Sequence, residues 1–496
     1  MKLKRDMSVI FLVGSFLLLL PFSESKDVRW KWQAGSSSVN QVATDLGLGA
    51  RSGGMVLKDY NTYNNLYLFG GLVYDPKLNK QRLTNDLWFI NGGVPSENIL
   101  HKGNSGQGVK RGTDQLPAPR MLGAGCGIPG AMFMVYGGYG EQDVLADTWI
   151  YDFRLKNWSS FEKMHSDMKE NDTDLLSPPA RADMAVWCLR DKLVIFGGIG
   201  VKAQIFRDMW EFDFRTLTWR EMENSVLMRN QIYNNHLTLW PEPRNGATTW
   251  VKDTALYLFG GNRAPNYNIN YHHNTGFGSD LFMYNITEGT WRYVHGRRQT
   301  GQAGKFAFVG QHTRDNEPGC RRGGAGIVDT SGNLWLFGGE GADVQTNSIS
   351  SVKPPKRLAD LWHFDVLKNQ WAFKAGFESG NSAGIYNGDK NTYYTGSQPG
   401  SRFDTMAVVA GNTILVFGGT GMDAGGKEGL LSDFWEIDMH NYVAYFSATY
   451  SGTIFNLIFW PFTLVAIICV SFLYGRKFFD KPGTKRDIAY APLTQE

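Results

Sequence analysis

Six arginines recur along the chain, each at the start of a stretch of small and apolar residues. They are Arg51, Arg120, Arg181, Arg244, Arg322 and Arg402. A ring of guanidinium groups could bind an acidic peptide or an anionic sugar, but paired structural ions would use the same groups. Six aspartates recur in step with them, namely Asp86, Asp147, Asp208, Asp280, Asp360 and Asp433. The sequence favours pairing for most of the arginines and leaves one or two for a ligand.

Other reactive groups form no catalytic set. His272 and His273 stand together between residues 262 and 279, but no cysteine or carboxylate lies at a ligand-like spacing, so solvated histidines are expected and no metal site. No nucleophile lies beside a base at a spacing that would support catalysis. We therefore expect a protein that is not an enzyme and needs no cofactor.

Cysteines and asparagines suggest covalent modifications. Cys469 lies in a long apolar segment near the C-terminus. Three cysteines remain, an odd number that permits at most one internal disulfide without indicating which pair forms it: Cys126, Cys188 and Cys320. Three asparagines stand in glycosylation sequons: Asn157, Asn171 and Asn285. Asn171, which is expected in a loop, is the most favourable of the three.

Composition and charge indicate a globular protein. Of the 496 residues, 42% are hydrophobic and 20% are charged, which excludes disorder and collagen-like structure. High glycine, at 58 residues, and 16 tryptophans favour many short strands joined by tight turns. The net charge of +3 comes from the two ends of the chain. Nucleic-acid binding is therefore not expected, because phosphate neutralisation needs a surplus of Lys and Arg.

Both ends of the chain have the pattern of membrane signals. Residues 1–25 combine a basic start, an apolar run and small residues before a cleavage point, which predicts a secretory signal peptide. Thr453–Tyr474 carries no charge and would be roughly 33 Å long as a helix, enough to cross a hydrocarbon core of about 30 Å. Basic residues follow it, so residues 475–496 are expected in the cytosol and the rest in the lumen or outside the cell.

The expected cytosolic tail contains two short sorting patterns. Tyr490-Ala491-Pro492-Leu493 resembles the tyrosine-based signal read by clathrin adaptors, with Tyr490 and Leu493 as its key positions, and Phe478-Phe479 resembles an export signal of the endoplasmic reticulum. These patterns suggest a membrane protein of the secretory pathway, the plasma membrane, or the endosomal or lysosomal membrane.

The region between these ends is a sixfold repeat. Aliphatic residues, one aromatic residue and two glycines recur, and the glycine pairs begin at Gly70, Gly137, Gly197, Gly260, Gly338 and Gly418. Each pair is followed by one of the six aspartates, with an aromatic residue two positions later. Four repeats then place a tryptophan six residues after an Asp or Asn: Trp158, Trp219, Trp291 and Trp371. Each repeat is thus expected to form four short strands.

This series resembles the kelch repeat over nearly all of residues 30–440. The resemblance implies an all-β fold, a six-bladed β-propeller, with the tryptophans as core residues between blades. The sixth repeat lacks its outer-strand tryptophan, while Trp30–Gly35 matches the outer strand of the fifth repeat. We expect Trp30–Gly35 to supply that strand and close the ring, and so remove open edges. The outer strand of the first blade is expected somewhere within 96–104.

The connections between strands differ in length on the two faces of such a propeller. With strands named a to d outward from the axis, the b–c and d–a connections lie on one face and are mostly long. This long-loop face is the functional candidate, because loops carry binding; the opposite face, with the a–b and c–d turns, is the short-turn face. Ligand contacts are expected from 262–279, 340–359 and 372–401. Candidate ligand-binding arginines are Arg244, Arg322 and Arg402.

The expected organisation is a signal peptide (1–25), a propeller (26–447), a linker (448–452), one transmembrane helix (453–474) and a cytoplasmic tail (475–496). Its expected function is that of a membrane-anchored binding protein that presents the long-loop face to a protein or glycan ligand. Some kelch proteins use arginines at the channel mouth to hold acidic peptides. Two alternatives stay open: a kelch-type carbohydrate-active enzyme, and a trafficking protein that acts through its tail and clathrin adaptors.

Overall fold

The computed structural model describes most of the chain between Val28 and Asp438. The described residues are 28–42, 48–58, 66–91, 94–101, 116–130, 132–161, 164, 176–222, 240–263, 276–344, 355–394, 396–410 and 413–438. They belong to a compact unit that spans Lys26–Tyr442. Within these ranges no helix is long and apolar enough to cross a membrane. The expected signal peptide, transmembrane helix and tail lie outside them.

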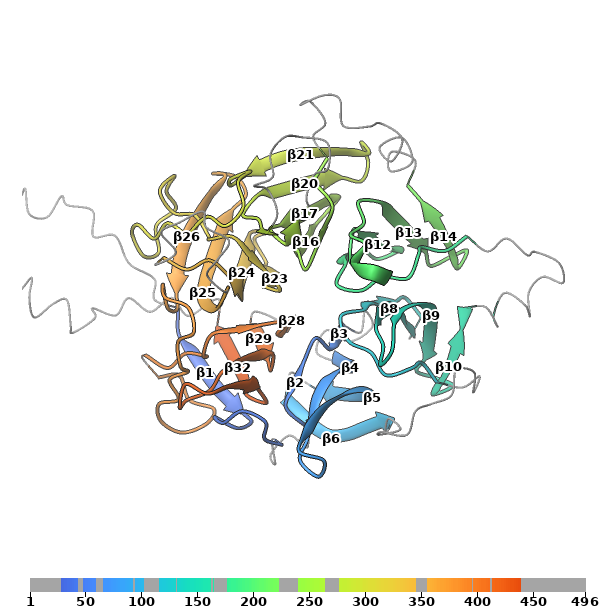
Figure 1. Cartoon of the computed structure of the whole chain (residues 1–496), viewed down its shortest axis with the longest axis horizontal. Coiled ribbons are helices and arrows are strands. Elements are labelled where there is room, and N and C mark those ends of the chain that lie inside the picture. Colours follow the sequence, from blue (N-terminus) through green and yellow to red (C-terminus); the bar gives the residue numbers. More distant parts are fainter. Residues whose placement is uncertain are drawn as a thin grey trace, which may run out of the picture. The chain divides into compact units, whose positions relative to one another are not determined.

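Six antiparallel four-stranded blades make up the described fold (Figure 1). The innermost strands are β3 (Met55–Lys58), β7 (Ala124–Ile128), β11 (Ala185–Cys188), β16 (Thr248–Lys252), β23 (Ala325–Val328) and β28 (Met406–Ala410). The second strands are β4 (Leu66–Asp75), β8 (Met132–Tyr139), β12 (Lys192–Phe196), β17 (Ala255–Phe259), β24 (Leu334–Gly341) and β29 (Thr413–Phe417). Each innermost strand contacts the innermost strands of the two neighbouring blades, and β28 contacts β3. The blades therefore form a closed circle.

The outer half of each blade completes the pattern. The third strands are β5 (Lys80–Asn91), β9 (Val144–Asp152), β13 (Met209–Asp213), β20 (Leu281–Asn285), β25 (Lys356–Asp365) and β32 (Phe434–Asp438). The outermost strands are β6 (Val94–His101), β10 (Asn157–Ser160), β14 (Thr218–Glu221), β21 (Thr290–His295), β26 (Gln370–Ala375) and β1 (Trp30–Ala34). The outer strand of the first blade, β6, overlaps the expected range and begins two residues earlier.

The N-terminal strand closes the ring as the sequence predicts. β1 pairs antiparallel with β32, with Trp30 opposite Ile437 and Trp32 opposite Trp435. The Trp30 side chain is 2% exposed, and its ring centroid lies 5.0 Å from that of Phe337 in the fifth blade. Because one blade takes strands from both ends of the repeat region, the ring cannot open without breaking a sheet.

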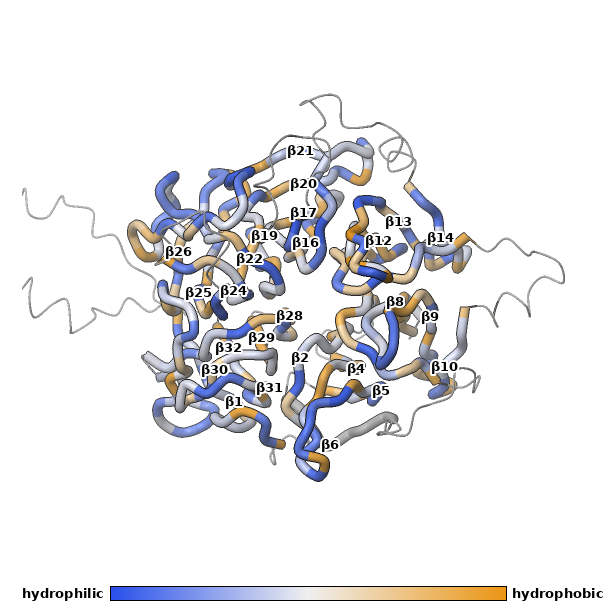
Figure 2. Tube along the Cα trace, in the orientation of Figure 1, coloured by the Kyte–Doolittle hydropathy of each residue, from blue (hydrophilic) through white to orange (hydrophobic). Residues whose placement is uncertain are grey.

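The recurrent tryptophans pack between blades. Trp158 of the second blade contacts Phe69 of the first at 4.9 Å between ring centroids, and Trp371 of the fifth contacts Phe259 of the fourth at 5.6 Å. All four outer-strand tryptophans are buried. Figure 2 shows the apolar stretches along strands such as β4 and β29. The prediction that these tryptophans are core residues is confirmed.

The double glycine marks a bulge where each blade meets the next. At Gly137–Gly138 the φ angles are +61° and +103°, a region that side chains disfavour. A Cβ on Gly137 would lie 2.5 Å from the carbonyl oxygen of Arg181 in the next blade, and the Gly138 N–H donates to that same oxygen. Glycine is required here because two backbones approach this closely.

Candidate functional site

The recurrent arginines are buried structural ions. Each guanidinium donates to both carboxylate oxygens of one aspartate of the same blade, at 2.6–3.1 Å. The pairs are Arg51–Asp86, Arg120–Asp147, Arg181–Asp208, Arg244–Asp280, Arg321–Asp360 and Arg402–Asp433. Each arginine also donates to the carbonyl of the first glycine of its pair. The expected pairing is confirmed, and these six form no cationic ring for a ligand.

In the fifth blade the paired arginine is Arg321, so its assignment to Arg322 was wrong. The sequence assignment took the arginine 15 residues before the aromatic residue, the spacing of the neighbouring repeats. The turn between β23 and β24 is longer: Val328 pairs with Leu334, whereas Val251 pairs with Leu256 in the fourth blade. The extra residue moves the true position one residue back. Arg322 is therefore free of the structural role.

The three candidate arginines lie in different environments. Arg244 and Arg402 have fully buried side chains that are bound to Asp280 and Asp433, so they offer no surface to a ligand. The Arg322 side chain is 28% exposed and contacts Glu340 at 2.6 Å. Of the three, the structure leaves Arg322 where a ligand could reach it.

A ring of six backbone hydrogen bonds surrounds the channel axis. Two residues after each paired arginine, the N–H donates to the carbonyl of the equivalent residue in the neighbouring blade, at 2.8–2.9 Å. The members of this axial ring are Gly53, Leu122, Asp183, Gly246, Gly323 and Asp404, and all six have positive φ. The bonds close on themselves, from Gly53 to Asp404. This ring defines the channel mouth on the long-loop face.

Three members of the axial ring depart from glycine, although positive φ is costly for other residues. Each of their side chains lies over a glycine of a neighbouring blade: a Cβ on Gly323 would lie 2.4 Å from Oδ1 of Asp404, and one on Gly246 would lie 3.0 Å from Oδ2 of Asp183. Strained backbone held by surrounding structure is often found at functional sites. The departures place two carboxyl groups at the channel mouth.

The charges at the channel mouth form a connected group, which we name the mouth cluster. Its members are Asp183, Arg322, Glu340, Arg357, Asp404 and Glu428. Arg322 lies 3.9 Å from Asp183, and Arg357 contacts both Glu340 and Glu428. Four carboxyl groups face two guanidinium groups, and three carboxylates remain even with a proton on Asp404, so the mouth cluster favours a positive ligand group.

The two ring carboxyls are incompletely compensated. Asn245 donates to Oδ2 of Asp183 at 2.7 Å, and burial nevertheless raises the pKa of Asp183. Burial together with the nearby Asp183 carboxylate raises the pKa of Asp404 to about 8. None of the described residues donates a hydrogen bond to the Asp404 carboxylate. A cation placed between the two carboxyls would relieve this repulsion.

Aromatic rings flank the guanidinium groups of the mouth cluster. Arg322 lies 5.8 Å from the ring centroid of Phe277 and 5.6 Å from that of Phe403. The guanidinium of Arg357 lies over the same Phe403 ring, 4.6 Å from its centroid. Tyr139 is partly exposed nearby, and burial and the Asp183 carboxylate raise its pKa. Charged and aromatic side chains together suit recognition of a polypeptide.

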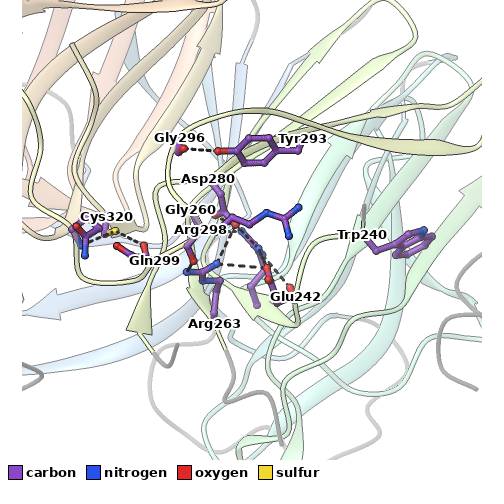
Figure 3. Close-up of polar contacts among 12 residues, drawn as sticks. Trp240, Glu242, Gly260, Arg263, Asp280, Tyr293, Gly296, Arg298, Gln299 and Cys320 are labelled. Carbon is purple, nitrogen blue, oxygen red and sulfur yellow. Dashed lines mark hydrogen bonds and ion pairs between the residues drawn. The ribbon is translucent and has the colours of Figure 1, made fainter. Parts of the chain in front are cut away.

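In the fourth blade the aspartate of the Arg–Asp pair, Asp280, has a different hydrogen-bond partner, and this difference does not create a binding site. In the other five blades the tryptophan two residues after the aspartate donates its indole N–H to that carboxylate. Phe282 stands there in the fourth blade, and Arg263 donates to Asp280 instead, at 3.3 Å. Figure 3 shows Arg263 among Asp280, Glu242 and Arg298. Arg263 is 3% exposed, so we interpret this group as structural.

The channel is apolar away from its charged mouth. A cavity of about 240 Å³ is lined by the innermost strands of the third to sixth blades, including Val186, Val251, Val328 and Val409. On the innermost strands of the second and third blades, Cys126 and Cys188 form a disulfide, while Cys320 is free and buried. The disulfide adds a covalent link between two blades that packing and backbone hydrogen bonds also join.

Other predicted sites are distributed as follows. Asn157 is exposed. Asn285 is partly buried, and its side-chain oxygen accepts from the N–H groups of Thr287 and Glu288, as Asp152 does in the second blade. The described residues contain no group of three metal-ligating side chains. Five further predicted positions lie outside the described residues: Asn171, the histidine pair at 272–273, Tyr490 and Leu493.

Two of the long d–a connections take an unexpected path. Residues 305–317 and 385–398 each form a hairpin, and these hairpins lie along the outer strands β26 and β1 of the fifth and sixth blades. Much of the expected ligand loop 372–401 thus covers a sheet edge instead of reaching the channel mouth.

Sequence reasoning did not find the mouth cluster. One signal was present, because the second residue after the arginine is glycine in three repeats and Leu122, Asp183 or Asp404 in the others. Its meaning depends on the closed axial ring, which brings residues 183 and 404 together although they are far apart in the chain.

Comparisons with known proteins agree with this architecture. Residues 168–313 match the KLHDC2/KLHL20/DRC7 Kelch-repeats domain. The chain is 24% identical over 233 residues to the leucine-zipper-like transcriptional regulator 1 homolog of Drosophila melanogaster. This alignment covers 47% of the chain and 20% of that protein. It is 29% identical over 158 residues to an F-box/kelch-repeat protein of Arabidopsis thaliana. This alignment covers 30% of the chain and 28% of that protein. The chain thus spans less than a third of the length of these relatives. The six repeats, the closed ring of blades and these matches together show that the chain is a kelch-repeat protein.

Proposed function

We propose that this protein is a membrane-anchored binding protein of the secretory pathway, whose propeller recognises a protein ligand at the channel mouth. The observation that carries the proposal is the mouth cluster. The buried Arg–Asp pairs recur in every blade and serve the fold. Asp183 and Asp404 stand at ring positions that are glycine or leucine in the other four blades, and no other blade has an arginine at the position of Arg322. The fold therefore does not require these side chains.

The ligand group that enters the mouth is a cation, such as a lysine or arginine side chain. With a proton on Asp404, three carboxylates against two guanidinium groups still leave the mouth cluster negative. The partly exposed rings of Phe277 and Phe403 add apolar contact area to the charged contacts. This differs from the expected acidic peptide or anionic sugar, because the buried arginines cannot serve as a positive surface.

A lumenal or extracellular location fits the covalent features of the propeller. The Cys126–Cys188 disulfide is typical of oxidising compartments, and the exposed Asn157 is accessible to glycosylation. The residue patterns of 1–25 and 453–474 supply the signal peptide and the single span of this proposal. Epitope tags on both sides of 453–474 and protease treatment of sealed microsomes would test the topology. A tail protected from external protease would contradict it.

Binding of defined probes to the purified full-length chain tests the ligand class. The probes are lysine-rich, glutamate-rich and neutral peptides of equal length and a sialylated glycan. We expect the lysine-rich peptide to bind best, and Asp404→Asn to weaken it at least tenfold. Glu288→Gln is the matched control, because Glu288 lies in a c–d turn on the short-turn face and has no part in the mouth cluster.

Two outcomes would contradict the proposal. Preferred binding of the glutamate-rich peptide or the glycan, weakened by Arg322→Gln, would mean that the mouth selects anions. Binding that is lost in Glu288→Gln and kept in Asp404→Asn would place the site on the short-turn face. Melting curves of each variant separate loss of binding from loss of fold.

A further inference from the structure

The hairpin 305–317 covers the outer edge of the fifth blade. The Gly310 N–H donates to the carbonyl of Phe373 at 2.7 Å, and the Thr313 N–H to that of Trp371 at 3.3 Å. Phe306 packs at 4.9 Å from the ring of Trp362. These contacts occupy main-chain acceptors of β26 that an exposed edge strand would offer to another polypeptide.

A chain of hydrogen bonds runs from this hairpin into the blade. Nε2 of His312 lies 2.7 Å from Nδ1 of His363 on β25, and Nε2 of His363 lies 3.3 Å from the Asp329 carboxylate. Because a carboxylate only accepts, His363 donates through Nε2 and accepts at Nδ1 from the N–H of His312. Both rings are neutral in this arrangement.

The surroundings of both rings disfavour protonation. His363 is 7% exposed, and its ring lies 4.7 Å from that of Trp335. Burial lowers the pKa of His363, although Asp329 opposes the shift. Burial, followed by the positive charge of Lys374 and then those of His363 and Lys368, lowers the pKa of His312 to about 4. Asp365 is the remaining carboxylate that acts on these rings.

The second hairpin provides a matched comparison without histidine. Residues 385–398 cover β1 of the sixth blade, where the Asn391 N–H donates to the carbonyl of Trp32. This hairpin is held by phenol groups: Tyr386 donates to Asp433 and Tyr393 to Glu436. Burial raises the pKa of Tyr386 well above its usual value. Tyr386 therefore stays uncharged between neutral pH and pH 4.

We propose that the His312–His363 pair is an acid-operated latch, which holds the hairpin 305–317 on the fifth blade at neutral pH and releases it in acid. One added proton leaves the contact intact, because it can bind Nδ1 of His312 while the Nε2–H of His312 still donates to Nδ1 of His363. A second proton makes both facing nitrogens donors and places two positive rings 4.9 Å apart, which breaks the contact. Release uncovers the carbonyls of Trp371 and Phe373, so the acid form presents an edge to a strand of another polypeptide.

Hydrogen–deuterium exchange of the purified full-length chain tests the latch. Exchange is measured from pH 7.4 to pH 4.0 and corrected for the intrinsic pH dependence of amide exchange, with peptides from 305–317 and 385–394 compared in the same sample. We expect protection of 305–317 to fall at least tenfold in acid while 385–394 stays protected. Equal behaviour of the two hairpins over the whole pH range would overturn the proposal.

Two variants separate histidine titration from general acid unfolding. His312→Gln keeps a donor near the position of Nε2 and cannot titrate, so its hairpin should stay protected at pH 4.5. Lys374→Gln keeps a donor for the carbonyl of Gly310 and removes a positive charge that disfavours protonated rings while the hairpin is held on the blade, so release should move to lower pH. An unchanged midpoint in Lys374→Gln, or unchanged release in His312→Gln, would show that the pair is not the latch.

Discussion

Trp30, in the first described strand, packs on Phe337 of the fifth blade with ring centroids 5.0 Å apart. Equivalent contacts occur elsewhere in the ring, where an outer-strand tryptophan packs on the aromatic residue that precedes the double glycine of the blade before it. Examples are Trp219 on Tyr136 and Trp291 on Phe196. Trp30 therefore takes the place of the tryptophan that the sixth repeat lacks.

Trp30→Ala should destabilise the whole propeller, because it leaves a large cavity at the blade interface that closes the ring. Replacing a buried tryptophan by alanine costs about 3–5 kcal/mol. Denaturant unfolding of the purified protein measures this loss, with Leu367→Ala as control because Leu367 is 93% exposed. A free energy of unfolding within about 0.5 kcal/mol of the parent would contradict closure by β1.

The buried ion pairs should tolerate removal of one partner poorly. In Arg402–Asp433 both side chains are fully buried, so Asp433→Asn leaves a buried guanidinium without a counter-charge. We expect a loss of about 3 kcal/mol or more, measured by thermal and urea unfolding. Arg322→Gln is the matched control, since Arg322 is partly exposed and outside these pairs; a larger loss in the control would reverse our assignment of roles.

The repeat pattern predicts the blades well because each role depends on short-range chemistry. The double glycine, the Arg–Asp pair and the interblade tryptophan recur at nearly fixed spacing. The strand β1 could be predicted because Trp30 matches the outer-strand tryptophan that the sixth repeat lacks. The one-residue error at Arg322 arose from a longer turn between β23 and β24, which spacing alone does not detect.

The rest depends on contacts between residues far apart in the chain. Asp183 and Asp404 meet only because the axial ring closes, and the pairing of Cys126 with Cys188 follows from the adjacency of β7 and β11. The hairpins 305–317 and 385–398 follow paths that depend on packing against outer strands. The repeat pattern does not predict these contacts, because the hairpins are not part of the repeat.

The disulfide should contribute to stability under oxidising conditions. Cys126 and Cys188 are 62 residues apart in sequence, so their bridge restricts a long loop of the unfolded chain. Replacing both by serine should cost about 2–4 kcal/mol and make the melting temperature insensitive to reductant. Cys320→Ala keeps the bridge, so its melting temperature should still fall on reduction; equal behaviour of the two variants would argue against the Cys126–Cys188 pairing.

The channel mouth should make stability depend on pH through Asp404. Its pKa is about 8 because of burial and of the nearby Asp183 carboxylate, whereas an unfolded aspartate has a pKa near 3.9. Between these values the folded protein holds a proton that the unfolded chain has released, so the contribution of this group to stability falls as the pH rises.

Asp404→Asn removes this dependence. The free energy of unfolding of Asp404→Asn should equal that of the parent near pH 4 and exceed it increasingly up to pH 8, where the difference should reach about 1 kcal/mol or more. Glu288→Gln, in an exposed turn, serves as the control with no such trend. A difference that stays constant with pH, or that shrinks as the pH rises, would mean that the Asp404 carboxyl is ionised throughout and that the two ring carboxyls do not oppose one another.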